Sequence, residues 1–120
     1  MITATILDIG DSWRISASIP NLSSQPRQQT IKVESWPMFA PEDVQLVASA
    51  STPRPTAPGQ SGRAEVDIPK RDLAEFDESR GVRTLKEGIY MFELKAPDDL
   101  SVGMGVVKQA SVVGSMTWRD

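Results

Sequence analysis

Apolar and polar residues alternate along two runs at the start of the chain, residues 2–9 and 12–19. This period of two is typical of β-strands that bury one face. Gly10-Asp11 separates the runs, and a glycine followed by an aspartate favours a two-residue hairpin turn with positive φ at the glycine. The pattern therefore predicts an N-terminal hairpin whose register gathers apolar residues on one face. Two pairs define that register: Ile6 with Ile15, and Ala4 with Ala17.

Further runs that alternate in the same way predict strands over residues 30–36, 44–50, 64–68 and 88–96. In each run the apolar positions are expected to face a core. The 88–96 run is the clearest, because bulky apolar side chains recur at every second position. The expected inward residues are Ile31 and Val33 in the first run; Val44, Leu46, Ala48 and Ala50 in the second; Ala64, Val66 and Ile68 in the third; and Tyr90, Phe92 and Leu94 in the fourth.

The segment from Pro69 to Arg80 departs from this alternation. Leu73 and Phe76 are three residues apart, proline suits the first turn of a helix, and Gly81 is suited to end one. We expect one short helix near residues 70–80, of about two or three turns. A short edge strand over Val82–Leu85 is expected to follow it.

Residues 51–62 have the sequence STPRPTAPGQSG, which is rich in proline and glycine and lacks bulky apolar residues. Such a run favours a long loop between strands, and loops of this length are often contact elements. Since it has no apolar side chain to hold it against a core, we expect it to be mobile alone and ordered against a partner. A plain spacer between strands is the alternative. Its expected protein-contact residues are Pro53, Arg54, Pro55 and Pro58.

Residues 100–118 carry a single charge, Lys108. Val112, Met116 and Trp118 fit one face of a strand, whereas Val107 and Val113 are hard to place on that face. Two interpretations stay open: the segment is buried against a protein partner, or it is a central strand covered by the N-terminal hairpin. On the first interpretation, Val107 and Val113 join the expected protein-contact residues.

Composition and charge narrow the chemistry. The 120 residues include 13 Lys and Arg, 16 Asp and Glu, and no His or Cys, for a net charge of −3. The cations are scattered near carboxylates along the sequence, so no nucleic-acid partner is expected. The missing cysteines and histidines remove thiolate nucleophiles, the commonest general base and the usual zinc ligands. No leader pattern and no run of about 20 apolar residues occurs, so no membrane partner is expected.

Carboxylates gather between residues 72 and 78, but their spacing matches no calcium-binding loop. We expect a solvated face on which cations between residues 70 and 80, Lys70 among them, neutralise these carboxylates. No nucleophile elbow and no phosphate-binding loop occurs in the sequence. The chain is therefore predicted not to be an enzyme, and no catalytic, cofactor-binding or metal-binding residues are assigned.

About seven or eight short strands, one short helix and turns rich in proline and glycine predict an all-β fold, an antiparallel β-sandwich, with a small barrel as the alternative. One strand is more specific, because Gly88-Ile89-Tyr90-Met91-Phe92-Glu93-Leu94 resembles the G-x-Y-x-F-x-L strand of immunoglobulin-like domains. The resemblance implies an immunoglobulin-like sandwich in which the Tyr90 hydroxyl caps the corner before its strand. A jelly-roll-like sandwich is the other candidate form. We expect a single domain over residues 1–120.

A short, acidic, cysteine-free β-sandwich is similar to the small accessory proteins of bacteriophage particles. That resemblance in size and fold implies a structural protein of the virion, a capsid decoration or head–tail joining subunit. Its partners would be capsid or other virion proteins, or copies of itself in a homo-oligomer, in the virion or the host cytoplasm. A small protein-binding inhibitor or adaptor is the second hypothesis. A carbohydrate-binding module is the third, with only Trp36 and Phe39 available as exposed aromatic residues.

Overall fold

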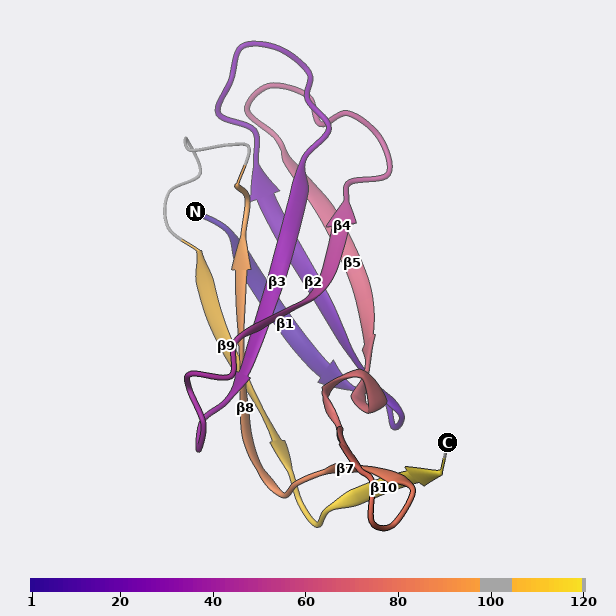
Figure 1. The fold of residues 1–120 in the computed structure, drawn as a ribbon. Helices are drawn as coiled ribbons and strands as arrows, with labels where there is room; N and C mark the ends of the chain where they lie inside the picture. Colours follow the sequence, from indigo (N-terminus) through magenta and orange to yellow (C-terminus); the bar gives the residue numbers. More distant parts are fainter. Residues whose placement is uncertain (98–104, 120) are drawn as a thin grey trace.

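Two antiparallel β-sheets pack face to face in the computed structural model, which describes residues 1–97 and 105–119 (Figure 1). One sheet has the order β1-β2-β5 and the other β4-β3-β8-β9, while β10-β7-β6 forms a small third sheet at one end. This arrangement confirms the predicted antiparallel β-sandwich, which is elongated, with extents of 55 × 24 × 21 Å. The elements are β1 (Thr3–Asp8), β2 (Ser12–Pro20), β3 (Thr30–Pro37), β4 (Gln45–Ser51), β5 (Ser61–Pro69), the 3-10 helix η1 (Lys70–Leu73), β6 (Glu75–Asp77), β7 (Val82–Leu85), β8 (Gly88–Lys95), β9 (Val106–Val112) and β10 (Met116–Arg119).

The N-terminal hairpin forms as predicted. The Ile9 amide donates a 3.0 Å hydrogen bond to the Ser12 carbonyl across the turn. Gly10 has a φ of 102°, a conformation that residues other than glycine rarely adopt. β1 and β2 therefore pair in the predicted register, with Ile6 opposite Ile15 and Ala4 opposite Ala17.

We expect Gly10→Val to lower the free energy of unfolding by about 1–2 kcal/mol, because a β-branched residue resists positive φ. No atom lies within 4 Å of a Cβ built on Gly10, so the cost would come from backbone strain and not from a clash. Urea unfolding of both proteins measures the difference. Gly10→Asn is the control, since asparagine tolerates positive φ better than valine does. Equal losses for the two variants would contradict this account of the turn.

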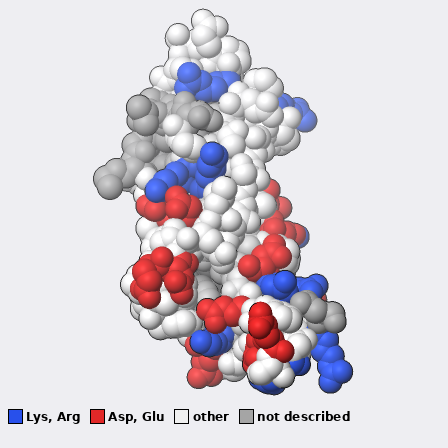
Figure 2. Space-filling view, in the orientation of Figure 1, with Lys and Arg blue, Asp and Glu red and all other residues white. Residues whose placement is uncertain are grey.

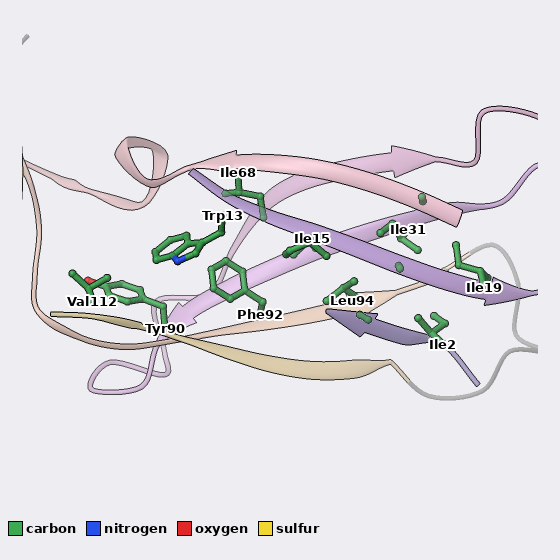
Figure 3. Close-up of a cluster of buried hydrophobic side chains, with 14 of the residues drawn as sticks. Ile2, Trp13, Ile15, Ile19, Ile31, Ile68, Tyr90, Phe92, Leu94 and Val112 are labelled. Atoms are coloured by element: carbon green, nitrogen blue, oxygen red, sulfur yellow. The ribbon is translucent and has the colours of Figure 1, made fainter. Parts of the chain in front are cut away.

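Apolar side chains of both sheets meet in one core between them (Figure 3). The Phe92 ring lies 5.2 Å from the Trp13 ring, centroid to centroid, in an edge-to-face arrangement. Tyr90 lies 6.0 Å from the same tryptophan ring. The inward faces predicted for the 30–36, 64–68 and 88–96 runs are confirmed, since Ile31, Val33, Ala64, Ile68, Tyr90, Phe92 and Leu94 are all buried.

Tyr90 makes the corner contact that the immunoglobulin-like resemblance implies. Its hydroxyl donates a 2.8 Å hydrogen bond to the carbonyl of Lys86, just upstream of β8. Burial raises the pKa of the Tyr90 hydroxyl, and the negative charge of Glu75 raises this pKa further. The hydroxyl therefore stays protonated, and able to donate, well above neutral pH.

The helix is shorter than predicted. η1 covers only Lys70–Leu73, and Ala74 is already extended, with ψ of 144°. The next residues form β6, which pairs with β7. Leu73 and Phe76, whose spacing indicated a helix, therefore lie in different elements. Short helices are marginal without an apolar face to bury, whereas pairing with β7 satisfies the same backbone groups.

β4 departs from simple alternation because it contains a β-bulge. The register of its pairing with β3 shifts between Leu46 and Ala48. An extra residue in one strand reverses which positions face the core on its two sides. Leu46 and Val44, predicted to be inward, are consequently exposed, whereas Ala48 packs against the core.

The 51–62 loop is bound to the segment of residues 20–29, and both lie at the top of Figure 1. Thr56 exchanges two backbone hydrogen bonds with Arg27, of 2.8 and 3.0 Å. The Asn21 side chain donates a 2.8 Å hydrogen bond to the Thr56 carbonyl. Thr52 and Thr56 are both buried. The expectation that nothing within the chain holds this loop is therefore wrong, because small polar residues do so through hydrogen bonds.

The end of the chain forms two strands. Residues 98–104, which include the start of the 100–118 segment, lie outside the described residues. A turn at Gly114, with φ of 78°, separates β9 from β10. Val112 belongs to the core, whereas Val107 and Val113 are exposed, at 45% and 94%. Val112 thus belongs to the core, but β9 is an edge strand of its sheet, so the interpretation of this segment as a central strand is wrong. The burial of Val107 and Val113 against a partner stays a prediction.

Candidate functional site

A hollow of about 450 Å³ opens near the end of the sandwich that carries β6 and β7. Residues 36–45, which connect β3 to β4, form its first wall. Residues 72–75, from η1 and the start of β6, form its second wall, and Tyr90 and Thr84 also line it. Figure 2 shows carboxylates on both sides of a recess in the lower half of the molecule. We call this recess the end hollow.

Turns hold the first wall in place. The Met38 amide donates a 2.8 Å hydrogen bond to the Ile89 carbonyl. The Ala40 amide donates a 3.0 Å hydrogen bond to the Pro37 carbonyl. The Asp43 amide in turn donates to the Ala40 carbonyl, also at 3.0 Å. This compact path turns the side chains of the wall outward, away from the core.

Phe39 stands at the rim of the end hollow. Its ring lies edge-to-face with that of Tyr90, with 6.0 Å between centroids. A Cβ on Gly88 would lie 3.2 Å from two carbons of the Phe39 ring. Glycine at this position therefore lets the ring pack closely against β8. Phe39 remains 55% exposed, which leaves much of the ring available to a partner.

Exposed apolar side chains run along the first wall and into β4. Exposure of these side chains ranges from 47% to 61%. Exposed large apolar residues that gather in one place mark interaction surfaces more often than isolated ones do. We call this group the apolar strip, and its members are Met38, Phe39, Val44 and Leu46.

The end hollow is acidic. Asp43 on the first wall and Asp72 and Glu75 on the second all line it. Glu75 lies 3.7 Å from the ammonium of Lys86, the one cation among the lining residues. Within residues 1–97 and 105–119, the carboxylates of Asp43 and Asp72 have no ion-pair or hydrogen-bond partner.

Thr84 adds a polar group to the end hollow. Its hydroxyl is buried and has no hydrogen-bond partner among the described residues. A buried hydroxyl without a partner costs about 1–3 kcal/mol relative to a satisfied one.

Charge is separated along the molecule. Residues 20–33 and 49–63, which form the loop end, contain four cations and no carboxylate: Arg27, Lys32, Arg54 and Arg63. Figure 2 shows basic side chains at this end, and both acidic and basic side chains over the lower half. Folding thus brings together four cations from segments that are distant in sequence.

Lys70 holds the second wall to the N-terminal hairpin. Its ammonium donates a 2.8 Å hydrogen bond to Asp8 and lies 5.3 Å from the centroid of the Trp13 ring. Its amide donates a 2.9 Å hydrogen bond to the Asp11 carbonyl. Only 6% of Lys70 is exposed, so its predicted place on a solvated face is wrong. The aromatic ring and the carboxylate compensate the burial of the charge.

We expect Asp8→Asn to lower the free energy of unfolding at pH 7 by about 0.5–1 kcal/mol, since Asp8 is partly exposed and asparagine can still accept a hydrogen bond. The hydrogen bond from Lys70 holds the pKa of Asp8 below its usual 3.8. A lowered folded-state pKa gives stability that is present above the usual value and is lost as the pH falls through the folded-state value. The gap between the two proteins should therefore narrow below about pH 4. Thermal unfolding across pH measures this gap.

Repeating Asp8→Asn in a Lys70→Met protein measures the contribution of the Asp8–Lys70 ion pair alone. Methionine keeps a linear apolar stem against Trp13 and removes the charge. In that background the effect of Asp8→Asn should fall to what the 2.9 Å hydrogen bond from the Gly10 amide to the Asp8 carboxylate contributes, and the difference is the coupling energy of Asp8 and Lys70. An undiminished effect of Asp8→Asn in the Lys70→Met protein would show that the pair contributes nothing.

The contact residues predicted from the sequence do not line the end hollow. Pro53, Arg54, Pro55 and Pro58 are exposed at the loop end. Val107 lies on β9, and Val113 follows β9. Their role as protein contacts stays a prediction. The sequence analysis missed the end hollow because its walls come from distant segments, although the exposed Met38-Phe39 pair in a turn between two prolines was a signal for it.

Other kinds of site find no support in the described part of the chain. Residues 1–97 and 105–119 contain no group of three or more His, Cys, Asp or Glu side chains arranged to hold a metal ion. Among the same residues, no helix has the length and apolar character needed to cross a membrane.

No protein-family model and no curated protein matches this chain. Solved structures do resemble it. β-Glucosidase 3B from Thermotoga neapolitana, in complex with glycerol, matches 100% of this chain with 17% of its own, at a TM-score of 0.78 and 21% identity. β-D-glucoside glucohydrolase from Trichoderma reesei matches 94% of this chain with 18% of its own, at a TM-score of 0.74 and 19% identity. A β-glucosidase from Kluyveromyces marxianus matches 98% of this chain with 15% of its own, at a TM-score of 0.72 and 17% identity.

These likenesses concern the fold. The chain has an immunoglobulin-like β-sandwich fold, which recurs as one segment of each of these larger proteins, and it spans less than a fifth of their length. The hypothesis of a virion accessory subunit, whether in capsid decoration or head–tail joining, is wrong, because the structures that resemble this chain are β-glucosidase segments. The error has a physical origin: size and β-sandwich architecture are shared by proteins with unrelated functions.

Proposed function

We propose that this chain is a non-catalytic accessory domain that packs against the catalytic part of a glycoside hydrolase. The observation that carries the proposal is the match of nearly the whole chain to one segment in β-glucosidases from a bacterium and two fungi. Identities of 17–21% with a common fold favour a shared architectural role over a shared set of site residues.

The surface beside the end hollow supports such packing. Interfaces between domains combine exposed apolar residues with polar and charged ones, and are less apolar than a core. Phe39 and Val44 of the apolar strip line the end hollow together with its carboxylates, and so provide this mixture.

Co-purification with glycosidase activity tests the proposal. The chain would be tagged and isolated under mild conditions from cells of its source organism, and the eluate assayed with an aryl β-glucoside. We expect hydrolysis in the eluate and none by the purified chain alone. Hydrolysis by the purified chain alone, or an eluate without glycosidase activity, would contradict the proposal.

A matched pair of variants makes the test specific to the proposed surface. Leu46 belongs to the apolar strip and is 61% exposed, while Leu7 on β1 is 59% exposed. We expect Leu46→Lys to remove most of the co-purified activity and Leu7→Lys to retain it. Both positions are exposed, so both variants should fold. Equal recovery with the two variants would show that the apolar strip is not the contact surface.

A further inference from the structure

We propose that the end hollow receives an arginine side chain from the partner protein. The inference rests on the proposed function and deepens it, because it names the chemistry by which the partner is recognised. Two properties of the end hollow support it: an excess of carboxylates and aromatic rings at the rim.

Charge selects a cationic occupant. Asp43 and Asp72 stand on opposite walls, and neither carboxylate is neutralised by another described residue. Lys86, the only cation among the described residues of the lining, already lies 3.7 Å from Glu75. A cation placed between the walls would therefore face two carboxylates without displacing an existing pair. Both carboxylates are exposed, so the attraction should weaken as the salt concentration rises.

Shape and surface favour arginine over lysine. Phe39 and Trp36 border the end hollow, and the flat guanidinium stacks on aromatic faces as well as binding carboxylates in two-pronged fashion. Its five N–H donors would serve carboxylates on both walls. A lysine ammonium has three donors and no flat face, so it would satisfy fewer of these groups.

The neighbouring apolar strip supplies the rest of the contact. Phe39 and Val44 belong both to the strip and to the lining of the end hollow, so the two surfaces are continuous. An arginine flanked by leucine or a similar residue would place its stem against these side chains while its head enters the recess. The expected partner segment is therefore an exposed turn or strand with one arginine between apolar residues.

Nuclear magnetic resonance with short peptides tests this inference on the full chain. The probes are acetyl-Leu-Arg-Leu-amide and the same peptide with citrulline in place of arginine, which has nearly the same shape and no charge. We expect the arginine peptide to shift amide resonances of residues 36–45, 72–75 and 84–86. The affinity of the citrulline peptide should be lower by a factor of about ten or more. Equal binding of the two peptides, shifts centred on residues 51–61, or no shifts at millimolar peptide would each overturn the inference.

Matched variants assign the interaction to the walls. We expect Asp43→Asn combined with Asp72→Asn to weaken binding of the arginine peptide at least tenfold. Glu42→Gln is the control, because it removes a neighbouring exposed charge that does not line the end hollow. Its effect should be less than twofold. The amide spectra also report whether each variant is folded. Equal effects of the double variant and the control would show that binding depends only on the net charge of the protein, and would overturn the inference.

The two experiments fail independently. If glycosidase activity co-purifies and depends on Leu46 but the arginine peptide does not bind, the accessory role stands and the arginine pocket is wrong. If the arginine peptide binds and no glycosidase activity co-purifies, the pocket stands and the proposed partner is wrong.

Discussion

Replacing Phe92 with alanine is expected to lower the free energy of unfolding by about 3–5 kcal/mol. Phe92 is fully buried on β8, and its ring packs edge-to-face against Trp13 between the two sheets. The substitution removes that burial and leaves a cavity that neighbouring strands cannot close. The loss would be a large share of the 5–15 kcal/mol that holds a typical domain together.

Equilibrium unfolding in urea measures this loss. Met91→Ala is the matched control, because Met91 is the neighbour of Phe92 on the same strand and is only partly buried. We expect it to cost about 1 kcal/mol or less. A loss below about 1 kcal/mol for Phe92→Ala would show that the core is not where the structure has it.

Gly62→Ala is expected to lower the free energy of unfolding by about 1–3 kcal/mol, although alanine is otherwise a better residue in a strand. A Cβ on Gly62 would overlap the Thr56 hydroxyl, and would lie 2.8 Å from Thr52 Cγ2 and 3.1 Å from Gln29 Oε1. Thr52, Thr56 and Gln29 are all buried, so none of them has space to move away. The substitution should therefore force the 51–62 loop away from the 20–29 segment.

Two measurements report on Gly62→Ala. Urea unfolding gives the stability, and amide hydrogen exchange shows whether the amide of Thr56 loses protection when its bond to Arg27 is strained. Ser61→Ala, at the exposed neighbouring position, should change neither. Full stability and full protection in the Gly62→Ala protein would mean that the loop is not held by its own chain.

Much of the fold follows from local patterns. Gly10 and Asp11 determine the turn of the first hairpin, and alternation on both sides of the turn determines its register. The faces of β3, β5 and β8 follow from alternation in the same way, since a half-buried strand has only two arrangements. The corner contact of Tyr90 was accessible through a family resemblance but not through periodicity.

The rest depends on contacts between distant segments. The bulge that exposes Leu46 is a property of how β4 pairs with β3, and no residue of β4 predicts it. β6 forms because β7 is available as a neighbour, which overrides a weak helical period. The end hollow unites Asp43 with Asp72 and Tyr90, and only the packing of the two sheets brings these segments together. Sequence analysis therefore found the scaffold and missed the site.

Hydrogen exchange on the chain bound to the proposed glycosidase partner tests the central claim most directly. If the chain docks through the end hollow and the apolar strip, amides of residues 38–46 and 72–75 will exchange more slowly in the complex. Amides of residues 51–61 at the loop end will exchange at the same rate in both states. Protection of residues 51–61 with no change at residues 38–46 and 72–75 would contradict the account and place the contact at the loop end.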